Sequence, residues 1–207
     1  MQMNKKRLFA FICLIAAAII GFVVLYRYID SVPVSFTATN IQKITVKNAD
    51  GAVLHESSDP SAFSVRIPKQ TTIEVGFVGR EGYETSSRNE RIGNKPKTVS
   101  IKPYYSTSRL ARLSANEQGA LTAALQKAYS PVIAQYSLSD FKLYHFGEWA
   151  SVTLRRADTQ ASRTDSYRVI LKKESGAWSV ETSPALLFYE NSHKTVPVDI
   201  LRQVNYS

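Results

Sequence analysis

An uncharged, apolar run from Leu8 to Tyr26 constrains this chain more than any other feature of the sequence. A helix rises about 1.5 Å per residue, so about 20 apolar residues cross the roughly 30 Å of hydrocarbon in a bilayer. The basic residues Lys5–Arg7 precede the run, and the positive-inside rule therefore places the N-terminus in the cytoplasm. We expect a cytoplasmic tail at residues 1–7, a single-pass transmembrane helix at residues 8–29 and an extracytoplasmic remainder.

A cleaved signal peptide is the alternative interpretation of this run. Signal peptides have a shorter apolar region, of about 7–15 residues, and end at a small-x-small cleavage site. The residues that follow here, YRYIDSVPV, contain no such site, which favours an uncleaved signal anchor. Cys13 is the one cysteine, so the chain has no internal disulfide and depends on its core. That is typical of proteins of a prokaryotic cell envelope.

The net charge of +9, from 26 basic and 17 acidic residues, is spread along the chain. An excess of this size suits proximity to anionic lipid or wall polymer. Nucleic-acid binding is not indicated, because no basic helix or basic stripe with interleaved aromatic residues accompanies the charge.

Residues 33–104 predict a small β-sandwich module. Apolar and polar residues alternate, for example in Val34–Ala38 and in Ile73–Phe77, as expected for antiparallel strands with one buried face. Asp50 and Gly51 separate two such runs, which predicts a hairpin.

Part of this module resembles PEGA-type extracytoplasmic β-sandwich domains. The resemblance rests on Ile67-Pro68, on the strand Ile73–Phe77 and on the turn Glu81-Gly82-Tyr83. It implies a spacer or a wall-proximal binding domain.

Residues 108–207 change to a helical pattern and then return to strands. Ser114 and Glu117 have the spacing of a capping box that opens a helix, and Pro131 is expected to end that helix near Tyr129. Ser175-Gly176 marks a tight hairpin. The further expected elements are strands at 141–146, 149–156, 166–173 and 177–182, a polar loop at 156–165 and a closing helix at 198–204.

This region resembles the NTF2-like and cystatin-like folds. Extracytoplasmic members of that superfamily carry a hairpin motif that is matched here by Tyr167, Val169, Leu171, Gly176, Trp178 and Val180. The resemblance implies an α+β domain in which a helix packs on an antiparallel sheet. VirB8-like subunits share the plan of one N-terminal membrane helix and an exported NTF2-like domain, although the inserted β module departs from it.

A cavity between helix and sheet is a candidate site in such a fold, with Tyr129, Asp140 and His145 as candidate lining residues. A histidine beside a carboxylate acts as a general base in many enzymes. A single histidine at a strand end more often hydrogen-bonds locally or faces solvent. We therefore expect no catalytic activity, no cofactor and no metal site, and keep a cavity enzyme built on His145 and Asp140 as an alternative.

Three groups of residues are candidates for an interaction surface. Tyr104 and Tyr105 either pack the modules together, which is favoured, or are exposed for binding. Phe188 and Tyr189 belong to Leu186–Tyr189, which is buried as a strand, the favoured interpretation, or exposed as an apolar loop that marks a partner site. The basic candidates Arg80, Arg88 and Arg91 are diluted by nearby glutamates, which favours a solvated rim.

These observations indicate a membrane-anchored, extracytoplasmic interaction or scaffold protein of a prokaryotic envelope. Its expected partners are the membrane and either envelope proteins or wall polymer. A component of a secretion or conjugation apparatus and a binder of wall polymer or a small ligand remain open as alternatives.

Overall fold

The computed structural model describes residues 14–22, 25, 29–157 and 166–206. They divide into two compact units. The first contains the described residues up to Glu81 together with Thr85–Pro103, and the second contains Gly82–Glu84 and the described residues from Tyr104 onward. Each unit is built around hydrophobic residues of its own.

The predicted cytoplasmic tail at residues 1–7 and much of the predicted transmembrane segment (residues 8–13, 23–24 and 26–28) lie outside the described residues. Among the described residues, no helix has the length and apolar character that crossing a membrane requires. Most of the polar loop expected at 156–165 also lies outside them, from residue 158 onward.

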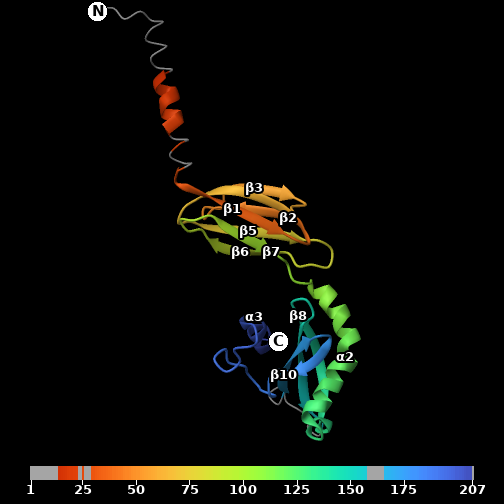
Figure 1. Ribbon diagram of the computed structural model, residues 1–207. Helices are drawn as coiled ribbons and strands as arrows, with labels where there is room; N and C mark the ends of the chain where they lie inside the picture. The colour runs from red at the N-terminus through yellow and green to blue at the C-terminus, as the bar shows by residue number, and fades with distance from the viewer. Residues whose placement is uncertain (1–13, 23–24, 26–28, 158–165, 207) are drawn as a thin grey trace, which may run out of the picture. The chain divides into compact units, whose positions relative to one another are not determined.

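The first unit consists of seven strands in two sheets (Figure 1). One sheet has the order β4-β1-β7 and the other the order β3-β2-β5-β6. The strands are β1 (Ser31–Ala38), β2 (Ile41–Lys47), β3 (Val53–Ser58), β4 (Ala62–Pro68), β5 (Thr72–Gly79), β6 (Ser86–Arg91) and β7 (Lys97–Ile101).

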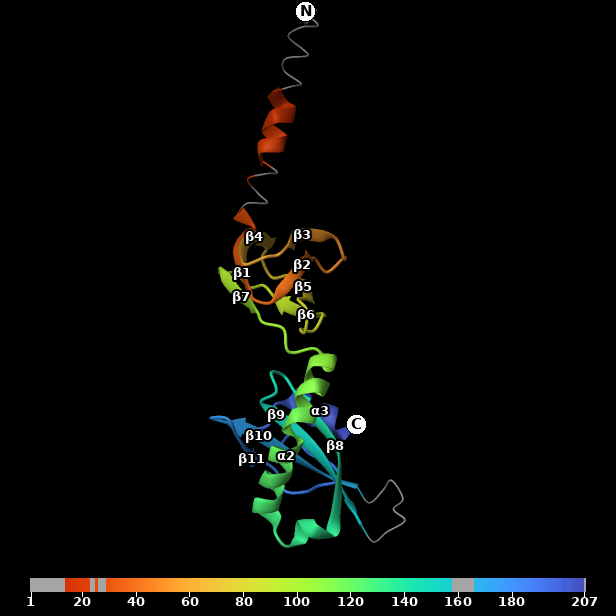
Figure 2. The same cartoon turned by 90° about the vertical axis from the view of Figure 1, so that its right-hand side faces the viewer.

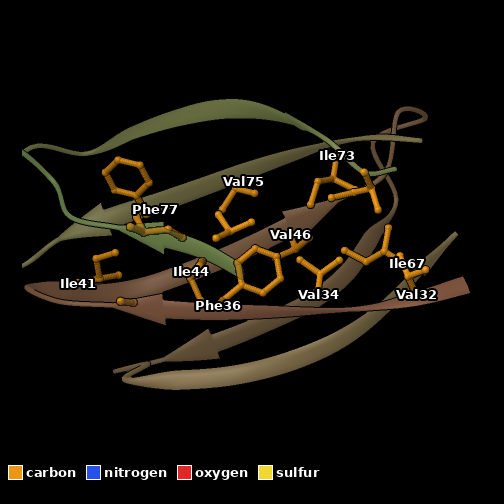
Figure 3. Close-up of a cluster of buried hydrophobic side chains, with 14 residues drawn as sticks. Val32, Val34, Phe36, Ile41, Ile44, Val46, Ile67, Ile73, Val75 and Phe77 are labelled. Carbon is orange, nitrogen blue, oxygen red and sulfur yellow. The ribbon is translucent and has the colours of Figure 1, made fainter. Parts of the chain in front are cut away.

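The inward-facing residues of the two sheets form one core (Figure 3). Val34 and Phe36 of β1 meet Ile44 and Val46 of β2, and all four are fully buried. The alternation seen in the sequence therefore corresponds to one buried and one exposed face, as predicted. The aromatic rings of Phe36 and Phe63 stack with centroids 4.8 Å apart, which extends the core toward β4.

Two features of these sheets differ from the sequence-based expectation. β1 pairs with β7 in parallel, whereas an antiparallel arrangement was expected throughout. The strand β6 is made of the polar residues SSRNER at the edge of its sheet, and nearly all of them are exposed. An exposed edge strand has no apolar face to bury, so the alternation of apolar and polar residues did not indicate β6.

The hairpin predicted at Asp50-Gly51 is confirmed between β2 and β3, with Gly51 at φ +82°.

The second unit is an α+β arrangement in which a four-stranded antiparallel sheet, of order β11-β10-β9-β8, lies between two helices (Figures 1 and 2). Helix α2 packs on one face and helix α3 on the other. The elements are α2 (Thr107–Tyr129), the short 3-10 helix η1 (Val132–Gln135), β8 (Tyr136–Tyr144), β9 (Trp149–Arg156), β10 (Ser166–Glu174), β11 (Ala177–Val180) and α3 (Val198–Asn205).

Several expectations for this unit are confirmed. The long helix ends at Tyr129, just before Pro131, and the closing helix is present as α3. The tight hairpin at Ser175-Gly176 joins β10 to β11, with both turn residues at positive φ. A long helix packed on an antiparallel sheet is compatible with the NTF2-like and cystatin-like folds.

The start of α2 was predicted wrongly from the Ser114–Glu117 spacing. The helix begins at Thr107, and its N-cap is Ser106, whose side chain accepts a hydrogen bond from the backbone N–H of Arg109. Ser114 lies inside the helix and is buried, and its hydroxyl donates to the carbonyl oxygen of Phe141 at 2.7 Å. The residue that resembled a cap therefore ties α2 to β8.

Glu117 joins α2 to the β10–β11 hairpin instead of closing a capping box. Its carboxylate accepts a hydrogen bond from Lys173 Nζ and another from Trp178 Nε1, each at 2.6 Å. These two hydrogen bonds stabilise the charged form and hold the pKa of Glu117 below its ordinary value. The carboxylate thus orients the tryptophan of the predicted hairpin motif against the helix.

We expect Glu117→Gln to destabilise the protein in a pH-dependent manner. Because the folded-state pKa lies below the unfolded-state pKa, the carboxylate stabilises the fold above the unfolded-state pKa, and this contribution is lost as the pH falls through the folded-state pKa. The free energy of unfolding at pH 7 should fall by about 1 kcal/mol. In urea titrations the difference from the parent should shrink as the pH drops below about 4.

Glu174→Gln is the matched control, because Glu174 forms an exposed pair with Lys172 at the same hairpin. It should change the free energy of unfolding much less at either pH. A difference for Glu117→Gln that stays constant down to pH 2–3 would contradict the role assigned to its charge.

Candidate interaction site

The segment Leu186–Tyr189 is an exposed loop, not the buried strand that the sequence favoured. It has no regular secondary structure, and only Phe188 turns inward, where it is 3% exposed. Leu186, Leu187 and Tyr189 are 49%, 52% and 67% exposed. We call these three side chains the apolar loop.

The backbone of this segment is held on both sides. Asn205 of α3 accepts a hydrogen bond from the N–H of Phe188 at 2.9 Å and donates one to its carbonyl oxygen at 2.8 Å. Arg168 of β10 donates to the carbonyl oxygen of Leu186 at 3.2 Å. Inside, Phe188 packs with Ile200 and its neighbours in the α3 cluster. The buried phenylalanine therefore anchors the segment, and its neighbours face solvent.

Polar side chains border the apolar loop. Glu190 directly follows Tyr189 and accepts a hydrogen bond from Arg202 of α3 at 3.1 Å, and both side chains are largely exposed. An exposed apolar centre with a charged rim has the composition of a protein–protein contact surface.

A second cluster surrounds His145, in the turn after β8. Its Nε2 atom lies 2.6 Å from Oδ2 of Asp199 in α3, and its ring stacks on Tyr104 with centroids 4.0 Å apart. The side chain of His145 is 11% exposed, and its backbone has φ +56°. This histidine therefore connects Tyr104 with the closing helix, and it also lines a hollow that includes Leu110 and Ser114 of α2.

The aromatic pair Tyr104-Tyr105 takes part in contacts inside the second unit. The guanidinium carbon of Arg109 lies 3.6 Å from the centroid of the Tyr105 ring, and Tyr83 meets that ring edge to face at 5.5 Å. Burial raises the pKa of Tyr104, and the carboxylates of Asp199, Glu84 and Glu148 add to the effect. The ring of Tyr105 is thus in contact with Arg109 and Tyr83, while Tyr104 stays partly exposed beside His145.

The three arginine candidates lie in the first unit and are not one surface. Arg80 pairs with Asp59, and Arg88 pairs with Glu90 at 3.1 Å. Arg88 and Arg91 both belong to β6, three residues apart, so they project to opposite faces of that strand.

The cavity candidates Tyr129, Asp140 and His145 line three different hollows of the second unit. Tyr129 lines an apolar hollow of about 190 Å³ that also includes Tyr136 and Tyr167. His145 lines one of about 440 Å³ with Tyr104. Asp140 lines a polar one of about 380 Å³, where its carboxylate lies 3.5 Å from Arg155. The structure therefore does not bring His145 and Asp140 together.

Two residues of α3 were missed by the sequence analysis: Asp199, which pairs with His145, and Asn205, which holds Phe188. Both partners are distant along the chain, and no local spacing relates them.

In the part of the chain that the structure describes, no three His, Cys, Asp or Glu side chains are grouped as a metal site would require. No protein-family model and no curated protein matches this chain.

The stack of Tyr104 on His145 predicts a measurable energetic coupling. In a double-mutant cycle with Tyr104→Ala and His145→Asn, we expect a coupling energy of about 0.5–1.5 kcal/mol in the free energy of unfolding. Asparagine is used because it tolerates the positive φ at this position. The control cycle combines His145→Asn with Tyr206→Ala, because Tyr206 is 91% exposed, and no coupling is expected there. Equal coupling in both cycles would refute the contact.

Proposed function

We propose that this protein is a membrane-anchored, extracytoplasmic interaction protein of a prokaryotic cell envelope, without catalytic activity of its own. Its second unit binds a protein partner through the apolar loop. The observation that carries this proposal is the exposure of Leu186, Leu187 and Tyr189 on a backbone that Asn205 and Arg168 hold in place.

The fixed backbone favours binding because a partner need not order the loop. Ordering a flexible segment costs free energy at the moment of association, and a held loop avoids most of that cost. A contiguous set of large exposed apolar side chains commonly marks such a contact. Tyrosine in addition supplies a large, rigid contact area with a hydroxyl at its tip.

The location outside the membrane is supported by the sequence. The uncharged run from Leu8 to Tyr26 and the basic residues Lys5–Arg7 before it favour an anchor with the N-terminus inside the cell. Membership of the NTF2-like superfamily is part of the proposal, and the helix on an antiparallel sheet is compatible with it. A VirB8-like component of a secretion or conjugation apparatus is a narrower version of the same proposal.

A binding role also fits the engagement of His145. Its Nε2 atom pairs with Asp199, and its ring is covered by Tyr104, so the imidazole holds α3 against the turn after β8. Asp140, the carboxylate that the alternative enzyme would require beside it, instead lies near Arg155. These contacts favour a structural role for the histidine.

The proposal is tested by photo-cross-linking in intact native cells. A photoreactive amino acid is placed at Leu187, and at Val53 of the first unit as the control, because Val53 is 56% exposed and Leu187 is 52% exposed. We expect one defined envelope protein to be cross-linked at position 187 and not at position 53. The adduct should sediment with membranes and be degraded by protease added to spheroplasts.

A variant with Leu186 and Tyr189 both replaced by serine should lose the adduct at position 187. Because both side chains are exposed, the free energy of unfolding should stay within about 0.5 kcal/mol of the parent. Cross-linking that persists in this variant, or that is the same at positions 187 and 53, would refute the proposed interface. An adduct that resists external protease would refute the location.

A further inference from the structure

A polar hollow of about 380 Å³ lies in the second unit, on the face of the sheet opposite α2. Three cationic side chains line it, each from a different strand: Lys142 of β8, Arg155 of β9 and Arg168 of β10. None of them was a candidate in the sequence analysis. Its volume is in the range of hollows that hold small molecules.

Strand register explains why these cations share one hollow. Ser151, Thr153 and Arg155 alternate along β9 and therefore project to the same face. Lys142 is the register partner of Ser151, and Arg168 is the register partner of Thr153. Successive rows are about 7 Å apart, so the long lysine and arginine side chains can reach one bound group.

Hydroxyl groups form the floor between the cations. Ser151 is 4% exposed and Thr153 is 8% exposed, and both belong to β9, one of the two inner strands of the sheet. The hydroxyl of Ser151 lies 2.8 Å from the phenolic oxygen of Tyr144. The inner strands of a packed sheet usually carry apolar residues, so two hydroxyls at these positions suit a polar ligand better than they suit packing.

The described residues that line the hollow carry more positive than negative charge. Among the described residues that line it, three are cationic and one, Asp140, is acidic. The carboxylate of Asp140 lies 3.5 Å from the guanidinium of Arg155. A bulge in β8 between Ser139 and Lys142 leaves Asp140 at φ +50°, where it lines the same hollow. The described residues of the lining therefore carry a net charge of about +2 at neutral pH.

We propose that this hollow binds a small phosphate monoester. A monoester carries a charge of about −1.5 to −2 at pH 7 and three terminal oxygens, which complement the net charge and the three cations. Guanidinium groups donate paired hydrogen bonds to phosphate oxygens, and a lysine adds a point charge. A carboxylate ligand offers fewer oxygens and half the charge. This site shares Arg168 with the support of the apolar loop, but the proposal does not depend on the proposed function.

The test is calorimetric titration of the full-length protein in detergent at constant ionic strength. The probes are glycerol 3-phosphate, inorganic phosphate and the diester dimethyl phosphate, and sodium chloride serves as the ionic-strength control. We expect saturable binding of glycerol 3-phosphate and inorganic phosphate with one site per chain. The diester, which carries a single negative charge, should bind at least about tenfold more weakly.

Two variants of opposite effect distinguish binding from general stability. Arg155→Gln should weaken binding of glycerol 3-phosphate by at least about tenfold. Asp140→Asn, which removes the carboxylate beside Arg155, should tighten it severalfold. Arg202→Gln is the control, because it removes an exposed arginine paired with Glu190 on α3 and should leave the affinity unchanged. Loss of fold cannot produce tighter binding, so Asp140→Asn tests the site even if Arg155→Gln destabilises the protein.

Absence of saturable binding for both glycerol 3-phosphate and inorganic phosphate would overturn the proposal. So would equal affinities in the parent, Arg155→Gln and Asp140→Asn proteins. If dimethyl phosphate binds as tightly as glycerol 3-phosphate, the assignment to monoesters is wrong and a phosphodiester polymer becomes the better candidate.

Discussion

The second unit depends on burying both faces of one four-stranded sheet. In β9 the residues Ala150, Val152 and Leu154 face α2 and are buried, so this face needs a long helix with an apolar face to cover it. The opposite face changes along the strand, from Trp149 at one end through Ser151 and Thr153 to Arg155. Only its apolar end requires a cover, and α3 with the anchored Phe188 provides one.

This change from apolar to polar residues along one face of the sheet explains both the apolar loop and the polar hollow. Because Phe188 must be buried beneath α3, the residues beside it are held at the surface, and two leucines and a tyrosine become exposed. At the other end of the face the sheet carries hydroxyls and cations, and a polar hollow remains beside Arg168. Arg168 itself links the two regions, since it lines the hollow and donates to the carbonyl oxygen of Leu186.

Local patterns in the sequence were sufficient for most of the fold. Alternation located the strands that have one buried face. Gly51 and Gly176 located two hairpins, because glycine readily adopts the positive φ that each of these turns has. The edge strand β6 was missed because its side chains are exposed on both faces. The start of α2 was misplaced because the spacing of Ser114 and Glu117 resembles a capping box when only near neighbours are considered. In the structure Ser114 instead donates to Phe141, which is distant along the chain.

The sequence by itself determined the apolar N-terminal run, the division into a β region and an α+β region, and the apolar faces of the main strands and helices. These follow from composition and from periods of two and 3.6 residues, which depend on near neighbours only. Tertiary structure alone decided that His145 pairs with Asp199 and not with Asp140, and that Leu186–Tyr189 is a loop. It also decided that Lys142, Arg155 and Arg168 share a hollow. The reason is that strand register and helix docking bring together residues whose separation along the chain carries no periodic signal.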